Sequence, residues 1–314
     1  MPVDASPRPT ASASALRGFF DGDVWHSFRT SPVAIGAAVV ALLCLACAVL
    51  ADAIAPHNPF DLATLDLMDA LKPPAWLDGG ERRYLIGTDG QGRDILSALM
   101  YGTRISLFVG IASVLLSLLI GVGLGLLAGF VGGRVDAFVM RFCDVMLSFP
   151  PILVALMISG VGRGLFPDAP DALAFVVLVL AIALTGWVQY ARTVRGSTLV
   201  ERNKEYVQAA RVIGVSSFRI MRRHVLPNVL GPVLVLATIQ VASAIVTEAT
   251  LSFLGVGVPV TSPSLGTLIR NGNDYLFSGE WWITAWPSLT LVLITLSVNL
   301  LGDWLRDALN PRLR

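Results

Sequence analysis

The sequence predicts an all-α, polytopic membrane protein with six transmembrane helices. Of the 314 residues, 54% are hydrophobic and 14% are charged, whereas a soluble domain carries about a quarter charged residues. The mean hydropathy is +0.70. Six uncharged runs of about 18 or more residues each are long enough to cross a bilayer, which takes about 20 residues. Too few polar side chains are left to cover a surface that faces water.

Residues 1–53 predict a tail followed by the first transmembrane helix. The start of the tail is rich in Ala, Ser and Pro, and its second part carries aromatic residues that suit the membrane interface. We therefore expect a tail and an interfacial segment over residues 1–30, and the first helix over residues 31–53. A cleavable signal peptide is the alternative, but the apolar core is too long for one, so we expect an uncleaved helix.

Residues 54–104 predict a long external loop between the first two helices. It contains four prolines and ends in a glycine-rich stretch at residues 86–94. Gly87, Gly90 and Gly92 indicate backbone turns. A phosphate-binding loop is excluded, because no lysine follows these glycines and no strand precedes them.

The second helix carries a repeat of glycines. Residues 105–133 have no charge, and glycines recur there at every fourth position: Gly121, Gly125, Gly129 and Gly133. This spacing places them on one helix face, where the missing side chains permit close approach of another helix. A dinucleotide-binding fingerprint is excluded, because the whole run is apolar.

A short polar turn at residues 134–141 and a kinked third helix are expected next. Arg141 and Asp144 are three positions apart and can form an ion pair at the membrane edge. Pro150 and Pro151 force a kink partway along the helix. Kinks occur both in moving pore helices and as ordinary membrane-protein architecture, and the sequence does not distinguish the two.

The remaining three helices are expected at residues 172–191, 225–247 and 281–302. Glu248 directly follows the fifth helix, and two glycines and a proline then break the chain. Because a carboxylate is costly against lipid, we expect Glu248 to face protein or water near the outer end of the pathway. The alternative is an interfacial acid that is held by backbone N–H groups of the following turn. The tail at residues 304–314 is short and basic.

A basic segment at residues 205–227 predicts two short helices joined by a tight turn. The first would end near Ile213, and Gly214 can adopt the left-handed conformation that closes a helix. Ser216 or Ser217 can cap the second helix by accepting a backbone N–H. Four apolar residues of the second helix are expected to share one face, away from its arginines. They are Phe218, Met221, Val225 and Leu226.

The order of small and apolar residues in this segment is specific. Ala209 and Ala210 are followed four positions later by Gly214, and a His-Val-Leu-Pro sequence ends at Pro227. These motifs resemble the cytoplasmic signature loop of bacterial ABC-importer permeases. Gln208 departs from the family, whose loop often carries Glu there. A second departure is the histidine three positions before the proline, where an aliphatic residue is usual.

Motifs before the second helix extend the resemblance. Residues 55–59, 86–94 and 101–107 closely resemble the external N-terminal region of C-type dipeptide/oligopeptide and nickel permeases. The resemblance covers the chain from about residue 17 to its end.

The resemblance implies the type I ABC-importer permease fold. Residues 105–303 would form a five-helix core with a cytoplasmic coupling loop at residues 192–227. In this family the loop forms a coupling helix that sits in a groove on the ATPase subunit. The matching positions are Gln208, Ala209, Ala210, Arg211, Gly214, Val215 and Pro227. Glu248, Pro150 and Pro151 are candidate residues of the translocation pathway.

The resemblance also implies the import of dipeptides and oligopeptides received from an external solute-binding protein. The other expected partners are a second homologous permease subunit, two ATPase subunits or domains and membrane lipid, with no nucleic acid. Neither Lys72 nor Lys204 ends a G-x-x-x-x-G-K sequence. We therefore expect that this chain binds no cofactor. The partner ATPase subunits would bind ATP and Mg and would hydrolyse the ATP.

The distribution of basic residues predicts that both termini lie in the cytoplasm, with the chain in a bacterial inner membrane. If the N-terminus is cytoplasmic, the segments on that side carry 16 Lys and Arg, and the external segments carry 7. This asymmetry follows the positive-inside rule. The coupling loop would then face the compartment that holds ATP.

Three alternatives remain. The same subfamily serves nickel and other small solutes, so nickel is the alternative cargo. An ion-coupled carrier would typically show paired acids inside its helices. A membrane enzyme would need convergent ionisable residues there, but the three histidines lie outside the helices, and the three cysteines read as apolar packing residues. We therefore expect no catalytic centre and no metal site.

Overall fold

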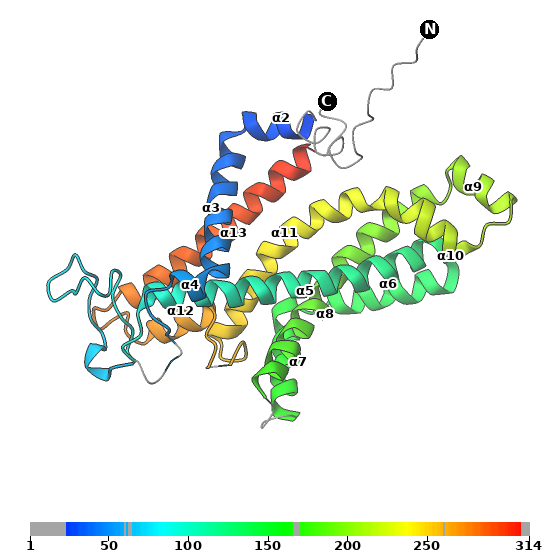
Figure 1. Cartoon of the computed structure of the whole chain (residues 1–314). Helices are drawn as coiled ribbons and strands as arrows, with labels where there is room; N and C mark the ends of the chain where they lie inside the picture. Colours follow the sequence, from blue (N-terminus) through cyan, green and yellow to red (C-terminus); the bar gives the residue numbers. More distant parts are fainter. Residues whose placement is uncertain (1–22, 60, 62–64, 166–169, 260, 309–314) are drawn as a thin grey trace, which may run out of the picture.

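The fold is seen in a computed structural model that describes residues 23–308, apart from residues 60, 62–64, 166–169 and 260 (Figure 1). Residues 1–22 and 309–314 of the expected tails lie outside the described residues. The N-terminal elements are α2 (Asp23–Thr30), α3 (Pro32–Val49), α4 (Ala51–Ile54) and the 3-10 turn η1 (Leu67–Asp69). The core elements are α5 (Ile95–Val131), α6 (Gly133–Leu147), α7 (Pro151–Leu165), α8 (Asp171–Glu201), α9 (Glu205–Val212), α10 (Ser217–Ile220), the π-turn η2 (Met221–Val225), α11 (Leu226–Phe253), α12 (Leu265–Asn273) and α13 (Trp282–Ala308).

Five helices in the described part of the chain are long and apolar enough to cross a membrane. They are α3, α5, α8, the continuous helix Ser217–Phe253 that contains α11, and α13. The sixth candidate is the pair α6 and α7, which is bent by 90°. The expected third span therefore corresponds to two helices, and the break between them lies at residues 148–150, directly before Pro151.

The pair α5 and α8 forms the centre of the core, and glycines set how closely the two helices approach. A Cβ atom at Gly121 would lie 2.5 Å from the carbonyl oxygen of Trp187, and one at Gly125 would lie 2.5 Å from that of Ala191. At Gly129 the carbonyl oxygen of Arg195 would be 2.9 Å away. Any side chain at these three glycines would push the α8 backbone away.

The fourth glycine of the repeat is not part of this packing, and the expectation for Gly133 is wrong. Helix α5 ends at Val131, and Gly132 and Gly133 have φ angles of 72° and 57°. A Cβ at Gly133 would meet nothing within 4 Å. The left-handed backbone turns the chain into α6, so the four-residue spacing no longer keeps Gly133 on the same face. Residues 134–141, expected as a polar turn, belong to helix α6.

Helix α5 begins at Ile95, well before the boundary expected at residue 105. Asp94 caps it by accepting a hydrogen bond of 2.9 Å from the N–H of Ser97. Arg104 was taken as part of the loop because it is charged, but it lies inside the helix. Its Nε donates to the carbonyl oxygen of Ala48 at 2.7 Å, so the charge is held at the end of α3.

The segment between α4 and α5 is folded against the ends of other helices. The N–H of Lys72 donates to Thr88 Oγ1 at 2.8 Å, and the indole of Trp282 on α13 donates to the carbonyl of Thr88 at 3.2 Å. Gly87 and Gly92, expected in turns, have φ angles of 91° and 77°. Helix α12, which the sequence analysis did not predict, lies beside this segment at the same end of the molecule (Figure 1).

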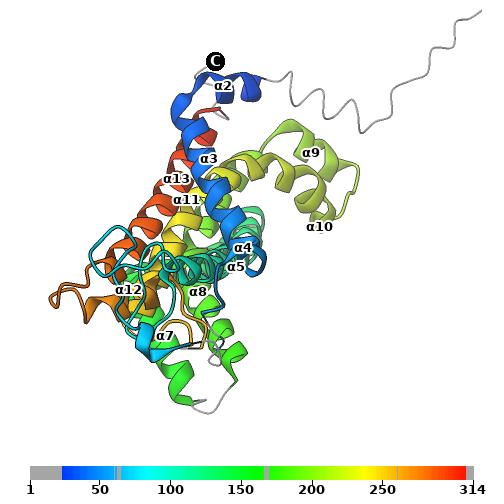
Figure 2. The ribbon, with the colours of Figure 1, turned by 60° about the vertical axis from the view of Figure 1, so that its left-hand side comes forward.

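The opposite end carries α9 and α10, which project away from the bundle (Figure 2). Helix α8 runs on to Glu201, so the first part of the expected 192–227 loop is helical. Helix α13 packs against α3, α11 and α12. The ring of Trp304 near its end lies 5.1 Å from that of Phe28 on α2.

Candidate functional site

The 205–227 segment folds as two short helices around a tight corner. Helix α9 is closed by Gly214, whose φ angle is +80°. The N–H of Gly214 donates to the carbonyl of Arg211 at 3.0 Å, and the N–H of Val215 donates to that of Ala210 at 3.0 Å. This pair of bonds is the Schellman motif, in which a glycine supplies the left-handed residue. Ser216 stands at the start of α10, but its side chain makes no capping bond.

The corner presents an apolar surface that the described residues of the chain do not cover. Val212 is 87% exposed, Ile213 is 77% exposed and Phe218 is 69% exposed. We call these three residues the corner patch. Among the positions that match the family, Gln208, Ala209, Arg211, Gly214 and Pro227 are exposed, Val215 is half-buried and Ala210 is buried.

The expected apolar face of the second helix is partly wrong. Val225 is fully buried, but Phe218 is exposed and Ile220 takes its place in the core. The cause is the π-turn η2, in which the N–H of Leu226 reaches back five residues to the carbonyl of Met221. A π-turn winds less tightly than an α-helix, so it rotates the residues before it relative to those after it.

Pro227 neither stops the helix nor starts a separate one. The helix continues from Ser217 to Phe253. Proline has no N–H and crowds the preceding turn, and the π-turn lies directly before it. The carbonyl of His224 in this turn accepts a 2.6 Å hydrogen bond from the side chain of Asn228.

Polar contacts fix the corner to the ends of the long helices. Arg202 after α8 donates to the carbonyl of Gly129 at 2.8 Å, and the guanidinium of Arg211 lies 5.1 Å from the ring centre of Phe130. The hydroxyl of Tyr206 donates to Glu201 at 2.5 Å. Burial and this carboxylate raise the pKa of Tyr206 to about 12, so the phenol stays protonated and keeps the bond.

Two ion pairs join α6 to α8 near this end. Arg195 binds both carboxylate oxygens of Asp136, with Nη2 at 2.6 Å from Oδ2. Asp144 pairs with Arg192, and the expected pair with Arg141 is wrong. Spacing within one helix suggested Arg141, but α8 packs alongside α6 and brings a second arginine to the same carboxylate.

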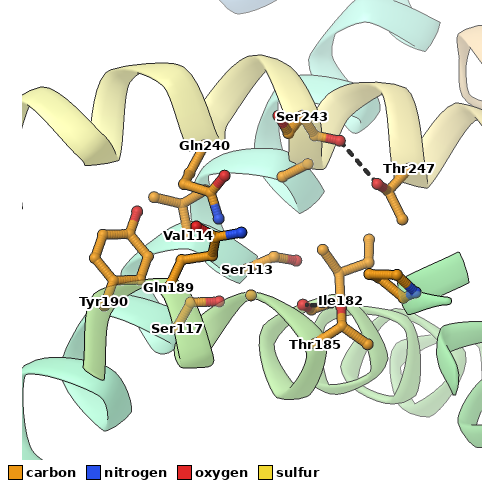
Figure 3. Close-up of a pocket in the computed structure, with 13 residues that line it drawn as sticks. Ser113, Val114, Ser117, Ile182, Thr185, Gln189, Tyr190, Gln240, Ser243 and Thr247 are labelled. Carbon is orange, nitrogen blue, oxygen red and sulfur yellow. Dashed lines mark hydrogen bonds between the residues drawn. The ribbon is translucent and has the colours of Figure 1, made fainter. Parts of the chain in front are cut away.

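A cavity of about 170 Å³ lies between α5, α8 and α11 (Figure 3). Helix α5 contributes Ser113 and Ser117, α8 contributes Gln189 and Tyr190, and α11 contributes Gln240. The space is large enough for several water molecules. Its polar residues recur three or four positions apart within otherwise apolar helices. The sequence analysis did not single them out, although a polar stripe at helical spacing was the signal that could have found them.

The three candidate pathway residues are placed differently around this cavity. Pro151 lines it, whereas Pro150 and Glu248 do not. Glu248 lies inside α11, which continues to Phe253, and its side chain is fully buried in protein.

Glu248 is held by two hydroxyls that are themselves bonded to backbone N–H groups. Ser106 and Ser252 each donate to the carboxylate at 2.7 Å. Ser106 Oγ accepts from the N–H of Leu265 at 3.2 Å, and Ser252 Oγ accepts from that of Val258 at 3.3 Å. The carboxylate therefore joins α5, α11, the turn after α11 and the start of α12.

Two family models match the sequence of this chain. The family described as "Binding-protein-dependent transport system inner membrane component" matches residues 121–314. The chain belongs to this family. A second description, "N-terminal TM domain of oligopeptide transport permease C", matches residues 20–74 of the permease.

Relatives of this permease match it over almost its whole length. The di/tripeptide transport system permease protein DppC of Pseudomonas aeruginosa is 41% identical, over 93% of this chain and 92% of the relative. The dipeptide transport system permease protein DppC of Escherichia coli K12 is 41% identical, over 93% of each chain. The oligopeptide transport system permease protein OppC of Bacillus subtilis is 36% identical, over 93% of this chain and 90% of the relative.

A solved structure has the same fold. It is the MetNI methionine ABC transporter, whose matching chain has a TM-score of 0.54 and 20% sequence identity, over 69% of this permease and 98% of that chain. At this identity the likeness concerns the fold alone. The predicted type I ABC-importer permease fold is confirmed.

Proposed function

We propose that this permease is the transmembrane subunit of an ATP-driven importer, and that it carries dipeptides and oligopeptides delivered by an external solute-binding protein. The observation that carries the proposal is the corner at Gly214. It exposes an apolar patch, yet hydrogen bonds and ring contacts fix it to the ends of α5 and α8. A rigid exposed corner can transmit movement from a docked ATPase to the helices that line the cavity.

Peptide is favoured over nickel by the chemistry of the cavity. The lining residues offer hydroxyl and amide groups, which match the N–H and C=O groups of a peptide. Nickel sites in proteins favour nitrogen and sulfur ligands such as imidazole and thiolate. The names of the relatives, which include dipeptide and oligopeptide permeases, support the same cargo.

The proposal requires further subunits. A second homologous permease would complete the pathway, and two ATPase subunits or domains would bind ATP and Mg and hydrolyse the nucleotide, with no catalytic centre or cofactor on this chain. The corner would face the cytoplasm together with both termini, and the segment between α4 and α5 would face the external binding protein. The membrane would be the bacterial inner membrane.

The mechanism follows from linkage between the two ends of the molecule. ATP closes the ATPase pair, which moves the docked corners and tilts the helices so that the pathway opens outward. The loaded binding protein then releases its peptide into the pathway, and hydrolysis returns the subunits to the inward-open state. For import to proceed, the loaded binding protein and ATP must favour the same state, since coupling between two sites is reciprocal.

Uptake in cells tests the proposal. We expect that deletion of the gene abolishes uptake of a radiolabelled dipeptide and leaves uptake of radiolabelled nickel unchanged, with dipeptide uptake restored by the gene on a plasmid. Loss of nickel uptake with normal dipeptide uptake would assign the permease to the alternative cargo.

A further inference from the structure

The central cavity has a lining of one chemical kind. Its polar residues carry hydroxyl or amide groups, and its described lining includes no Asp, Glu, Lys, Arg or His. Hydroxyls and amides donate and accept hydrogen bonds without carrying charge. The described lining therefore favours neither sign of charge over the other.

Most of the hydroxyls in the lining are already bonded to the backbone. Ser117 on α5 donates to the carbonyl of Ala183 on α8 at 3.1 Å. Thr185 and Thr247 donate to carbonyls of their own helices at 2.8 Å each. These groups stabilise the helices and are not free donors for a ligand.

Two hydroxyls are different. The side-chain oxygens of Ser113 and Tyr190 are buried and have no hydrogen-bond partner among the described residues. Tyr190 projects from α8 toward Gln240 on α11, and Ser113 lies between these helices on α5 (Figure 3). A buried polar group without a partner is unfavourable, because it has given up its hydrogen bonds to water. Both residues line the cavity, so a change of rotamer would turn their hydroxyls toward a group that enters it.

We infer that Tyr190 and Ser113 form a contact site for the main-chain amide of the peptide as it crosses the membrane. This inference rests on the proposed function. An amide offers one donor, its N–H, and one acceptor, its C=O. Each of the two hydroxyls can accept from the N–H or donate to the C=O. Because all peptides share the amide, a site of this kind binds them without regard to the charge of their side chains.

Transport by the complete complex tests this assignment. The permease is reconstituted in proteoliposomes with its partner permease, ATPases and binding protein, and ATP-dependent uptake is measured with the binding protein saturated. The peptides are Ala-Ala, Glu-Ala, Lys-Ala and Ala-Ala methylated on its amide nitrogen. The variants are Tyr190→Phe and Ser113→Ala, and the control is Thr250→Val. Thr250 lies on α11 outside the lining, and its hydroxyl bonds only to its own helix in the described structure.

We expect each variant to slow uptake of the three unmethylated peptides by one common factor, between about twofold and tenfold, the range for loss of one neutral hydrogen bond. The wild-type complex should take up the methylated peptide more slowly than Ala-Ala, because methylation removes the amide N–H. The variant that lacks the hydroxyl accepting from this N–H should slow uptake of the methylated peptide little further. Thermal stability of Tyr190→Phe should match the wild type, because the structure shows no bond to lose.

Two results would overturn the assignment. One is that both variants take up each of the four peptides at the wild-type rate, which would make the cavity a water-filled space without specific contacts. The other is that a variant slows uptake of Glu-Ala and of Lys-Ala by different factors, which would mean that these residues contact the side chains of the peptide. Failure of the proposed function has another signature, since the wild-type complex would then import none of the unmethylated peptides.

Discussion

The carboxylate of Glu248 accepts a hydrogen bond of 2.7 Å from the hydroxyl of Ser106, and this bond joins α11 to α5 in a fully buried position. We predict that the two side chains are energetically coupled. Glu248→Ala and Ser106→Ala should each destabilise the permease, and the double variant should lose less than the sum by about 0.5–3 kcal/mol, the range that covers hydrogen bonds to neutral and to charged groups.

The free energy of unfolding in detergent measures this coupling. Ser243→Ala is the control, because among the described residues that hydroxyl bonds only to the carbonyl of Ile239 in its own helix. Additive losses for Glu248→Ala and Ser106→Ala would mean that the bond contributes nothing to stability.

The glycines of α5 allow a matched pair of variants. A Cβ at Gly125 would lie 2.5 Å from the carbonyl oxygen of Ala191, whereas a Cβ at Gly123 would meet nothing within 4 Å. Gly125→Ala should therefore destabilise the protein by about 1–3 kcal/mol, since α5 and α8 must move apart. Gly123→Ala should be neutral or slightly stabilising, because alanine favours a helix over glycine. Equal thermal midpoints for the two variants would contradict the α5–α8 packing.

The stability of the segment between α4 and α5 should depend on pH through Asp69. Hydrogen bonds from Lys72 and Tyr84 lower the pKa of Asp69 below its ordinary value of 3.8. The ionised carboxylate therefore stabilises the fold above pH 3.8, and this contribution is lost as the pH falls through the lower pKa of the folded state. Thermal unfolding should show Asp69→Asn less stable than the wild type at pH 7, with a difference that shrinks in acid.

The exposed carboxylate of Asp78 supplies the control for this series. Asp78→Asn removes a carboxylate from the same segment and should leave the thermal midpoint at pH 7 at the wild-type value, because this side chain is exposed. A difference between Asp69→Asn and the wild type that stays constant from neutral to acid pH would show that the ionised form of Asp69 does not stabilise the segment.

The orientation in the membrane can be tested by labelling single cysteines. Asp78 lies in the segment between α4 and α5, and Lys204 directly precedes α9; both residues are exposed. These two parts of the chain lie at opposite ends of the molecule (Figure 1). With the three native cysteines replaced, a membrane-impermeant thiol reagent should reach Asp78→Cys in intact cells and should reach Lys204→Cys only after the cells are opened. The reverse pattern would place the corner patch outside the cell.

Local signals predicted the long apolar helices of this fold but not α12, and contacts between distant residues decided the helix boundaries. Gly214 closes α9 as predicted, because the need for a left-handed residue at a helix end is a local property. Arg104 and Glu248 were taken as helix ends because they carry charge. Both lie inside helices, since α3 and two serines respectively supply partners that no local pattern reveals.

The same division applies to the candidate site. The corner is encoded within about 20 consecutive residues, and its backbone was predictable. The cavity lies between three helices, so its polar residues form one site only when α5, α8 and α11 are packed together. A single helix sequence does not show this. Phe218 was misplaced because a π-turn changes the helical period within the segment.

The central claim is that transport is coupled to ATP hydrolysis through the corner at Gly214. Its φ angle of +80° costs about 1–2 kcal/mol for most side chains, and less for asparagine, which adopts this conformation more readily. Nothing lies within 4 Å of a Cβ at this position, so Gly214→Val strains the backbone without a clash inside the permease. Gly214→Asn is the matched control.

The most direct measurement is ATP hydrolysis stimulated by peptide-loaded binding protein, in the complex reconstituted with Gly214→Val. We predict that the variant inserts into the membrane normally but loses most of the stimulation, and that Gly214→Asn retains more of it. Stimulation at the wild-type level in Gly214→Val, together with normal peptide uptake, would contradict coupling through this corner.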